Sequence, residues 1–356
     1  MVDFAGYAMP VQYSAGIMAE HLHTRAAAGL FDVSHMGQAL LDGADADAVL
    51  ESVTCADLAT LKPGRIRYSL LLNDTGGIID DLMITRLETG ALHLVLNASR
   101  KSVDHAVLQG ACAGKDAALT ILEDKALIAI QGPRAGSVVQ TILPGSDALA
   151  FMDAAPGRFE GTDILMSRCG YTGEDGFELS VDAASAPALA EALLAHEETQ
   201  LAGLGARDSL RLECGLCLYG HDIDETTTPI EAGLTFAIGK RRKMARDFPG
   251  GARVMGQLDN GCDRVRVGLM VDGRRPVREG AMLLSPEDKE IGVVTSGGHS
   301  PTLGQPIAMG YVPQEFSQDG IALKADVRGK AVPVQVSPLP FVPQRYRRRS
   351  AMQAAS

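Results

Sequence analysis

Three apolar runs separated by glycine-bearing turns occupy residues 65–98, and they constrain the fold more than any other part of the sequence. The runs are RIRYSLLLN, IIDDLMITRL and ALHLVLNA, with turns at 74–77 and 88–90. Short runs of Ile, Leu, Val and Tyr bounded by Asn, Asp and Gly are typical of antiparallel strands. We therefore expect a β-meander over residues 65–98.

A second group of strand-like runs lies further along the chain, at 126–132, 158–170 and 176–181. Helical patterns flank these runs. Residues 14–28 form one candidate helix, and residues 183–199 form a stronger one because leucines recur there at helical spacing. Strands and helices in this mixture predict an α+β fold.

The sequence pattern changes after Gly220, from mixed helical and strand-like runs to a polar connection followed by short strand-like runs. Residues 240–251, which contain KRRK and DFPGG, read as an exposed connection. Beyond them, short strand-like runs alternate with Gly, Pro and Asp, which is typical of a β-barrel or sandwich. We therefore expect an α+β portion over 1–250, an all-β portion over 255–347 and a disordered tail over 348–356.

Composition narrows the class of protein without naming an activity. The 356 residues carry 33 basic and 44 acidic side chains, a net charge of −11, which argues against a general nucleic-acid binder. No apolar run reaches the ~18 residues of a membrane-spanning helix, so we expect no membrane partner. Six scattered cysteines fit a reducing compartment, and we expect a cytoplasmic protein. Cys214 and Cys217 form a lone CxxC that falls short of a zinc site, so no metal is expected.

Two adjacent aspartates interrupt the apolar run IIDDLMI at 78–84. Because neighbours in a strand point to opposite faces, Asp80 and Asp81 each share a face with apolar residues. A carboxylate in such surroundings is costly unless it is paired or hydrogen-bonded, which makes this pair a candidate for proton transfer. The alternative is an acid that caps a backbone amide or ends a strand at the surface. The alternation of side chains along the strand does not by itself show which of the two aspartates is functional.

A second acidic segment, GYTGEDGFE at 170–178, places Glu178 inside the strand-like run FELSV. Glu178 either projects from a sheet into a cleft or belongs to a solvated hairpin. Downstream, Arg207 and Arg211 are four residues apart and share one face of a helix. In one interpretation, these arginines pair with Glu178 or Asp80 in a functional site. In the other, which is commoner in proteins, they form ion pairs on the surface of the helix. Together these residues indicate a pocket for proton transfer and for a neutral or anionic organic ligand.

Eight segments, spread in order from residue 1 to residue 346, resemble the T-protein family of the glycine cleavage system, the tetrahydrofolate-dependent aminomethyltransferases. They are MVDFAGYAMPVQY (1–13), GLFDVSHMG (29–37), NDTGGIIDDL (73–82), GYTGEDGFE (170–178), GLGARDSLRLECGLCLYGHDIDETTTP (203–229), GKRRKMARDFPG (239–250), VTSGGHSPTLGQPIAMGYVP (294–313) and PFVPQRY (340–346).

The resemblance implies a fold and a reaction. The fold is a cloverleaf of two interleaved α+β domains with folate at its centre, followed by a C-terminal β-barrel. The substrate is the aminomethyl group on the dihydrolipoyl arm of a partner, the lipoylated H-protein. Its methylene passes to tetrahydrofolate, and ammonia is released.

The resemblance also implies roles for particular residues. The first aspartate of the family's IDD-type triplet is the main catalytic side chain, and it falls on Asp80. The residues implied in binding the folate are Glu178, Arg207 and Tyr346, with Asn97, Tyr171 and Met36 in matching segments. A carboxylate such as Glu178 suits the paired N–H groups of a pterin ring.

Two other classes of function stay open at this point. One is another folate-dependent one-carbon transferase or demethylase of the same fold. The other is a non-enzymatic folate-binding protein, whose relatives carry a cysteine-bearing KGCYxGQE-like segment where this chain has GLCLYGHDID.

Overall fold

The computed structural model describes residues 1–349, and these divide into two compact units. The first unit contains Met1–Leu71, Asp81–Arg207 and the segment from Arg345, and the second contains Leu72–Asp80 and Asp208–Gln344. The chain therefore passes between units four times: inside two strands, after Leu71 and after Asp80, inside one helix, after Arg207, and again after Gln344.

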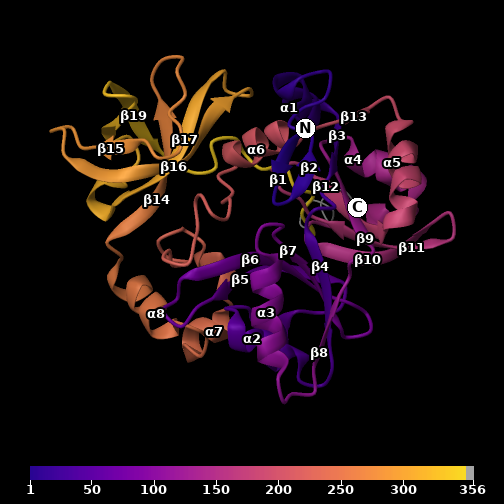
Figure 1. Ribbon diagram of the computed structural model, residues 1–356. Coiled ribbons are helices and arrows are strands. Elements are labelled where there is room, and N and C mark those ends of the chain that lie inside the picture. Colours follow the sequence, from indigo (N-terminus) through magenta and orange to yellow (C-terminus); the bar gives the residue numbers. More distant parts are fainter. Residues whose placement is uncertain (350–356) are drawn as a thin grey trace. The chain divides into compact units, whose positions relative to one another are not determined.

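The first unit is built on an 11-stranded sheet with the order β13-β3-β9-β12-β11-β10-β5-β6-β7-β4-β8 (Figure 1). β13 and β3 are parallel, whereas β9, β12, β11 and β10 pair in antiparallel fashion. A separate hairpin, β1 with β2, forms the N-terminus. The strand bounds are β1 Val2–Phe4, β2 Tyr7–Met9, β3 Ala28–Asp32, β4 Gly37–Asp42, β5 Arg65–Leu72, β6 Ile78–Arg86, β7 Leu92–Leu96, β8 Ala118–Ile121, β9 Lys125–Gln131, β10 Asp153–Phe159, β11 Thr162–Arg168, β12 Gly176–Asp182 and β13 Thr199–Leu201.

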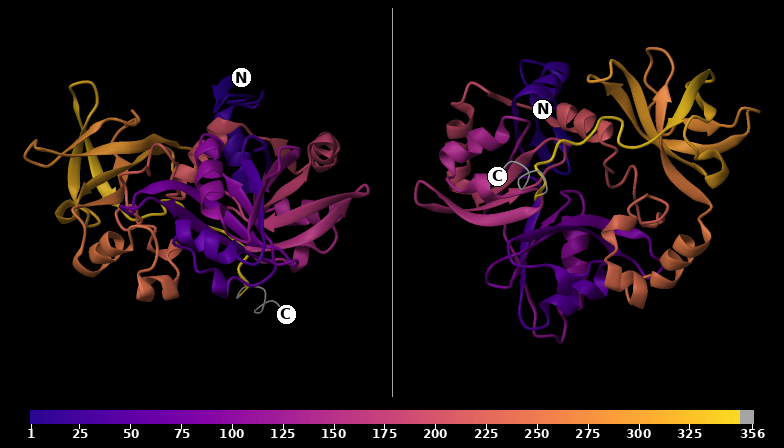
Figure 2. Two further views of the ribbon diagram at one scale, coloured as in Figure 1. Left: turned by 60° about the horizontal axis from the view of Figure 1, so that its bottom comes forward. Right: turned by 180° about the vertical axis from the view of Figure 1, so that it is seen from behind.

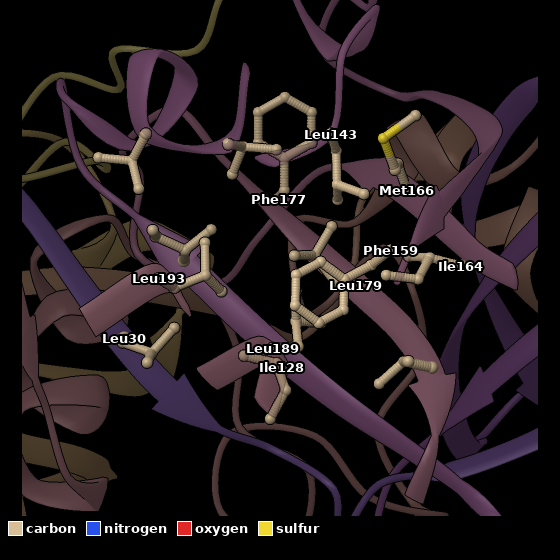
Figure 3. Close-up of a cluster of buried hydrophobic side chains, with 14 of the residues drawn as sticks. Leu30, Ile128, Leu143, Phe159, Ile164, Met166, Phe177, Leu179, Leu189 and Leu193 are labelled. Carbon is tan, nitrogen blue, oxygen red and sulfur yellow. The ribbon is translucent and has the colours of Figure 1, made fainter. Parts of the chain in front are cut away.

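Helices cover the faces of this sheet. Their bounds are α1 Ile17–Ala26, α2 Ala46–Val53, α3 Lys101–Cys112, α4 Ala135–Ile142 and α5 Ala186–Leu194, with short 3-10 turns at Leu58–Thr60, Ser146–Ala148 and Ala183–Ser185. Leu189 and Leu193 of α5 pack with alternate residues of β12, among them Phe177 and Leu179 (Figure 3). Because side chains alternate along a strand, this packing leaves Glu178 on the opposite face of β12.

The second unit ends in a closed barrel with the order β14-β17-β16-β15-β18-β19, shown in orange and yellow in Figures 1 and 2. Alternate residues such as Val267, Leu269 and Val271 point inward and form its core. The bounds in this unit are β14 Arg264–Val271, β15 Met282–Leu284, β16 Glu290–Ser300, β17 Gln305–Pro313, β18 Ala322–Asp326, β19 Ala331–Ser337, α7 Lys240–Ala245 and α8 Gly251–Asn260, with 3-10 turns at Thr235–Ala237 and Gln314–Phe316. Helix α6, Leu204–Glu213, begins in the first unit and ends in the second.

The structure confirms the α+β class, the C-terminal barrel and the meander, which is β5-β6-β7. It corrects two local expectations. The run expected over 158–170 is broken into β10 and β11, because Glu160 and Gly161 adopt positive φ values of 48° and 87° and turn the chain. The connection expected over 240–251 is mostly exposed, but it contains helix α7 and the first residue of α8, and Arg242 in it is buried and paired with Asp247 at 3.2 Å. The tail expected to be disordered lies, from residue 350 on, outside the described residues.

A buried histidine makes the stability of the first unit sensitive to acid. Nε2 of His93 lies 3.3 Å from Oε1 of Gln38, which also accepts a hydrogen bond from the Ser180 hydroxyl at 2.6 Å. Nδ1 of His93 has no hydrogen-bond partner among residues 1–349. Burial, and next the charge of Lys125, lower the pKa of His93 from 6.5 to about 4. His93 is therefore neutral in the folded protein, where only its Nε2 has a partner.

We expect His93→Gln to reduce the loss of stability in acid. A histidine whose folded pKa lies below its unfolded pKa contributes stability that is present above the unfolded pKa and is lost as the pH falls from 6.5 to about 4. The size of this contribution is about 3 kcal/mol. Urea unfolding at several pH values measures it. The control is His221→Gln at an exposed histidine, and equal pH slopes for His93→Gln and the wild type would contradict this role of His93.

Candidate functional site

Asp80 lies in the first half of β6 and is completely buried. It shares a face of the strand with Ile78, Leu82 and Ile84, which are at most 2% exposed. Asp81, on the other face, is only half-buried. The structure thus separates the two aspartates that the sequence left equivalent, and Asp80 is the carboxylate removed from water.

A tight turn and a wrapping loop fix the entry to β6. The Asn73 side chain accepts hydrogen bonds from the backbone amides of Thr75 and Gly77 and donates one to the carbonyl of Glu225 at 2.9 Å. A Cβ atom at Gly77 would lie 1.8 Å from that same carbonyl oxygen, so this approach requires glycine. The Ile78 amide bonds the carbonyls of Asp224 and Thr227. These contacts hold the strand segment that carries Asp80.

Asn97 follows β7 and binds the second aspartate. Its Nδ2 donates to the Asp81 carboxylate at 2.7 Å and to the Asp81 carbonyl at 3.1 Å. Asn97, for which the family resemblance implies a role in folate binding, thus links β6 to the chain that follows β7.

Glu178 lies in the middle of β12, opposite Ala129 of β9 and Ser167 of β11, and is 9% exposed. Burial raises the pKa of Glu178, while the charge of Arg207 and a hydrogen bond from Cys169 oppose that rise. The Cys169 thiol lies 3.5 Å from Oε2 of Glu178. In the part of the chain that the structure describes, no other hydrogen bond reaches this carboxylate, which leaves Oε1 available to a ligand.

Arg207, on the first turns of α6, stacks over the ring of Tyr171 with 4.7 Å between Cζ and the ring centroid. Burial lowers the pKa of Arg207, and the charges of Glu178 and Tyr171 oppose that change. Within residues 1–349 its guanidinium forms no ion pair at hydrogen-bond distance and donates no hydrogen bond. Glu178, Arg207 and Tyr171 are therefore brought together as the sequence predicted, with an acceptor and several donors unused.

The other acids of segment 170–178 hold the segment in place. Glu174 is buried and pairs with Arg25 at 2.7 Å and with Arg345 at 2.6 Å. Asp175 pairs with Arg168. The segment is thus an anchored loop rather than a solvated hairpin. Glu174 and Asp175 are held by arginines, whereas the buried Glu178 has only the Cys169 thiol as a hydrogen-bond donor among the described residues.

The three remaining candidate residues lie in different surroundings. Tyr346 stacks face to face on Phe151, with ring centroids 3.9 Å apart and an interplanar angle of 8°. Met36 lies in the turn between β3 and β4, where its amide bonds the Val33 carbonyl, and is partly buried. Arg211 is buried and pairs with Asp222 at 2.7 Å, so it belongs neither to a surface helix face nor to a pair with Glu178.

Two residues beside the site were not identified from the sequence. Cys169 contacts Glu178. The sequence feature that could have identified it is its position directly before the segment GYTGEDGFE. His35 is buried, and its pKa is lowered to about 4 by burial and by the charge of Arg207. Nothing in the sequence around His35 distinguishes it from a histidine with a purely structural role.

Within residues 1–349, no group of three or more His, Cys, Asp or Glu side chains could hold a metal ion. No helix in this described range is long and apolar enough to cross a membrane.

The class that fold and site define is an α+β sheet protein with a C-terminal barrel and a buried carboxylate close to the guanidinium of Arg207. The family model for the GCVT N-terminal domain matches residues 1–242, and the model for the glycine cleavage T-protein C-terminal barrel domain matches residues 264–343. The chain belongs to the glycine cleavage T-protein family.

Individual proteins that are similar to this chain are members of the same family. A mitochondrial aminomethyltransferase of Dictyostelium discoideum is 45% identical over 98% of this chain and 90% of its own length. The mitochondrial aminomethyltransferase of Homo sapiens is 46% identical over 97% of this chain and 87% of its own length. The crystal structure of glycine cleavage system aminomethyltransferase T from Bartonella henselae is 44% identical, with a TM-score of 0.93 over 98% of this chain and 95% of that one. The chain is accordingly an enzyme, an aminomethyltransferase of glycine cleavage, which decides against a non-enzymatic binding protein.

These relatives also correct one expectation. The cytoplasmic location expected from composition is wrong, because the curated relatives are named as mitochondrial enzymes. Unpaired cysteines indicate only a reducing compartment, and they do not distinguish the cytosol from another such compartment.

Proposed function

We propose that this aminomethyltransferase takes the aminomethyl group from the dihydrolipoyl arm of a lipoylated H-protein, passes its methylene to tetrahydrofolate and releases ammonia. The observation that carries the proposal is the buried Glu178 carboxylate with an unused oxygen beside the unused guanidinium of Arg207. We further assign residues 1–250 to folate binding and residues 255–347 to a separate barrel domain.

The residues present fit a reduced folate. A pterin ring presents adjacent N–H donors and a carbonyl, and these match one carboxylate acceptor and one guanidinium donor. Glu178 would accept the N–H groups, and Arg207, stacked on Tyr171, would donate to an oxygen. Tyr346, Asn97 and Met36 are proposed to line the same site. When bound, tetrahydrofolate supplies the nitrogens that receive the one-carbon unit.

Asp80 is proposed as the catalytic carboxylate. Burial on an apolar strand face strengthens its interaction with developing positive charge, because little water competes there. Its oxygens can also hold a proton during transfer of the methylene between nitrogens. The turn at 73–77 and its anchoring loop limit the movement of this strand segment, which favours a fixed direction of the carboxylate.

A reconstituted reaction tests the function. Lipoylated H-protein carrying a ¹³C-labelled aminomethyl group is mixed with tetrahydrofolate and this protein, and labelled methylenetetrahydrofolate and ammonia are measured together. We expect equal amounts of both products, and none with H-protein that lacks the lipoyl group. Folate binding without faster ammonia release, or transfer only from a methylated amine, would contradict the proposal.

Glu178→Gln should weaken tetrahydrofolate binding by about 10- to 100-fold, since a charged hydrogen-bond acceptor is replaced by a neutral amide that also presents a donor. Isothermal titration measures this change in Kd. Asp182→Asn, at the exposed end of the same strand, is the matched control and should leave Kd unchanged. Wild-type affinity in Glu178→Gln would remove Glu178 from the folate site.

A further inference from the structure

Cys169 occupies a boundary between apolar and charged surroundings. On one side it packs in a cluster with Ile66 and Ala154, and it is only 4% exposed. On the other side its thiol meets Oε2 of Glu178 at 3.5 Å. A thiol is a weak hydrogen-bond donor, but a hydrogen bond to a charged carboxylate oxygen is stronger than one to a neutral acceptor.

The thiol is held in its protonated form. Burial, and next the charge of Glu178, raise the pKa of Cys169 well above its ordinary value. A protonated thiol donates a hydrogen bond, whereas a thiolate would repel the neighbouring carboxylate. Cys169 therefore acts here as a donor and not as a nucleophile.

The backbone around Cys169 is fixed independently of Glu178. The carbonyl of Cys169 accepts a hydrogen bond from Nε2 of Gln131 at 3.0 Å, and Oε1 of Gln131 accepts one from the Thr172 hydroxyl at 2.8 Å. A Cβ atom at Gly170 would lie 1.8 Å from Gln131 Oε1, so the chain passes as close to this amide as glycine allows. The thiol is thus presented from a rigid support.

We propose that Cys169 is a positioning residue for the folate site: its S–H group holds Oε2 of Glu178 and thereby leaves Oε1 directed at the ligand. This inference rests on the proposed role of Glu178 in folate binding. The charged and titratable groups that act on Glu178 are Arg207 from α6 and Cys169 from the loop after β11, with Tyr171 beside Arg207. Without the thiol, only Arg207 opposes the effect of burial on Glu178.

Folate titrations of Cys169→Ala and Cys169→Ser test the proposal. Cys169→Ala should raise Kd about 3- to 10-fold, the loss expected for one weak donor on a charged acceptor. Since the pKa of Glu178 then rises further, binding should also be lost at a higher pH when the solution is acidified. Cys169→Ser restores a donor and should recover part of both changes. Cys55→Ala, at another fully buried free cysteine, is the matched control and should bind folate as the wild type does.

Equal weakening in the alanine and serine variants would reduce Cys169 to a packing residue and overturn the proposal, as would wild-type affinity and pH dependence in Cys169→Ala. The hydrogen bond itself is tested without ligand, by the S–H stretching band in the infrared difference between wild type and Cys169→Ala. This band should shift to higher frequency in Glu178→Gln, and an unchanged band would contradict the contact. Wild-type folate affinity in Glu178→Gln, with a band that does shift, would instead reject the folate role of Glu178 and retain the contact.

Discussion

Asp80→Asn should lower kcat for methylene transfer by about 10²- to 10⁴-fold, the range that a positioned acid–base group contributes. Asparagine has nearly the same shape as aspartate, so the buried strand face keeps its packing while the negative charge and the proton acceptor are lost. Folate binding should survive in part, because Glu178 and Arg207 are untouched. The reconstituted assay with loaded H-protein gives kcat, and titration gives Kd.

The neighbouring aspartate supplies the control for this prediction. Asp81→Asn changes the same functional group one residue further along β6, on the opposite, half-buried face, where it is bound by Asn97. We expect its kcat to stay within about tenfold of the wild type, below the acid–base contribution. Wild-type turnover in Asp80→Asn, or an equal loss in both variants, would remove Asp80 from its catalytic role.

Arg168→Met should lower the free energy of unfolding by about 3 to 5 kcal/mol, the usual loss when one partner of a buried ion pair is removed. Arg168 is 1% exposed and pairs with Asp175 through Nε at 3.0 Å. It also donates to the Leu149 carbonyl at 2.9 Å and lies 4.8 Å from the centre of the Phe177 ring. Methionine fills part of the volume but removes the cationic donor of the Asp175 carboxylate, which keeps only the Arg347 amide at 3.4 Å, and the donor of the Leu149 carbonyl.

Urea unfolding followed by circular dichroism measures this loss, since the chain has no tryptophan to report by fluorescence. Arg158→Met, in the same β10-β11 hairpin, is the control. Arg158 pairs with Asp163 at 3.6 Å, and both side chains are more than 70% exposed. Such a pair contributes less than about 1 kcal/mol. Equal destabilisation by the two substitutions would show that burial of Arg168 does not set its importance.

Local pattern was enough to predict the meander and the barrel. The runs between the turns at 74–77 and 88–90 contain their own strand and turn signals, and they form β5-β6-β7. The expectation of one run over 158–170 missed the turn at Glu160–Gly161, although a glycine within the polar stretch EGTD is an ordinary hairpin-turn signal. At α7 the basic sequence correctly suggested exposure for most residues, but it gave no sign of the helix or of Arg242, which is buried and paired with Asp247.

The candidate site shows the same division between local and distant information. The resemblance pointed to Glu178 and Arg207, and the structure brings them together with Tyr171. The role of Glu174 could not be read from its surroundings, since its partners Arg25 and Arg345 are 149 and 171 residues away in the chain. Only the folded chain shows that Glu174 is paired with these distant arginines, whereas Glu178 forms no ion pair at hydrogen-bond distance within residues 1–349 and accepts a hydrogen bond from Cys169.

The buried carboxylate on β6 is proposed to act on a reduced folate that Glu178 binds, and a crystal structure of the protein with 5-methyltetrahydrofolate decides whether it does. We expect the pterin N–H groups on Glu178 and the Asp80 carboxylate within hydrogen-bond distance of the nitrogen edge that receives the one-carbon unit. A pterin bound elsewhere, with Asp80 turned toward bulk water, would remove both residues from the reaction.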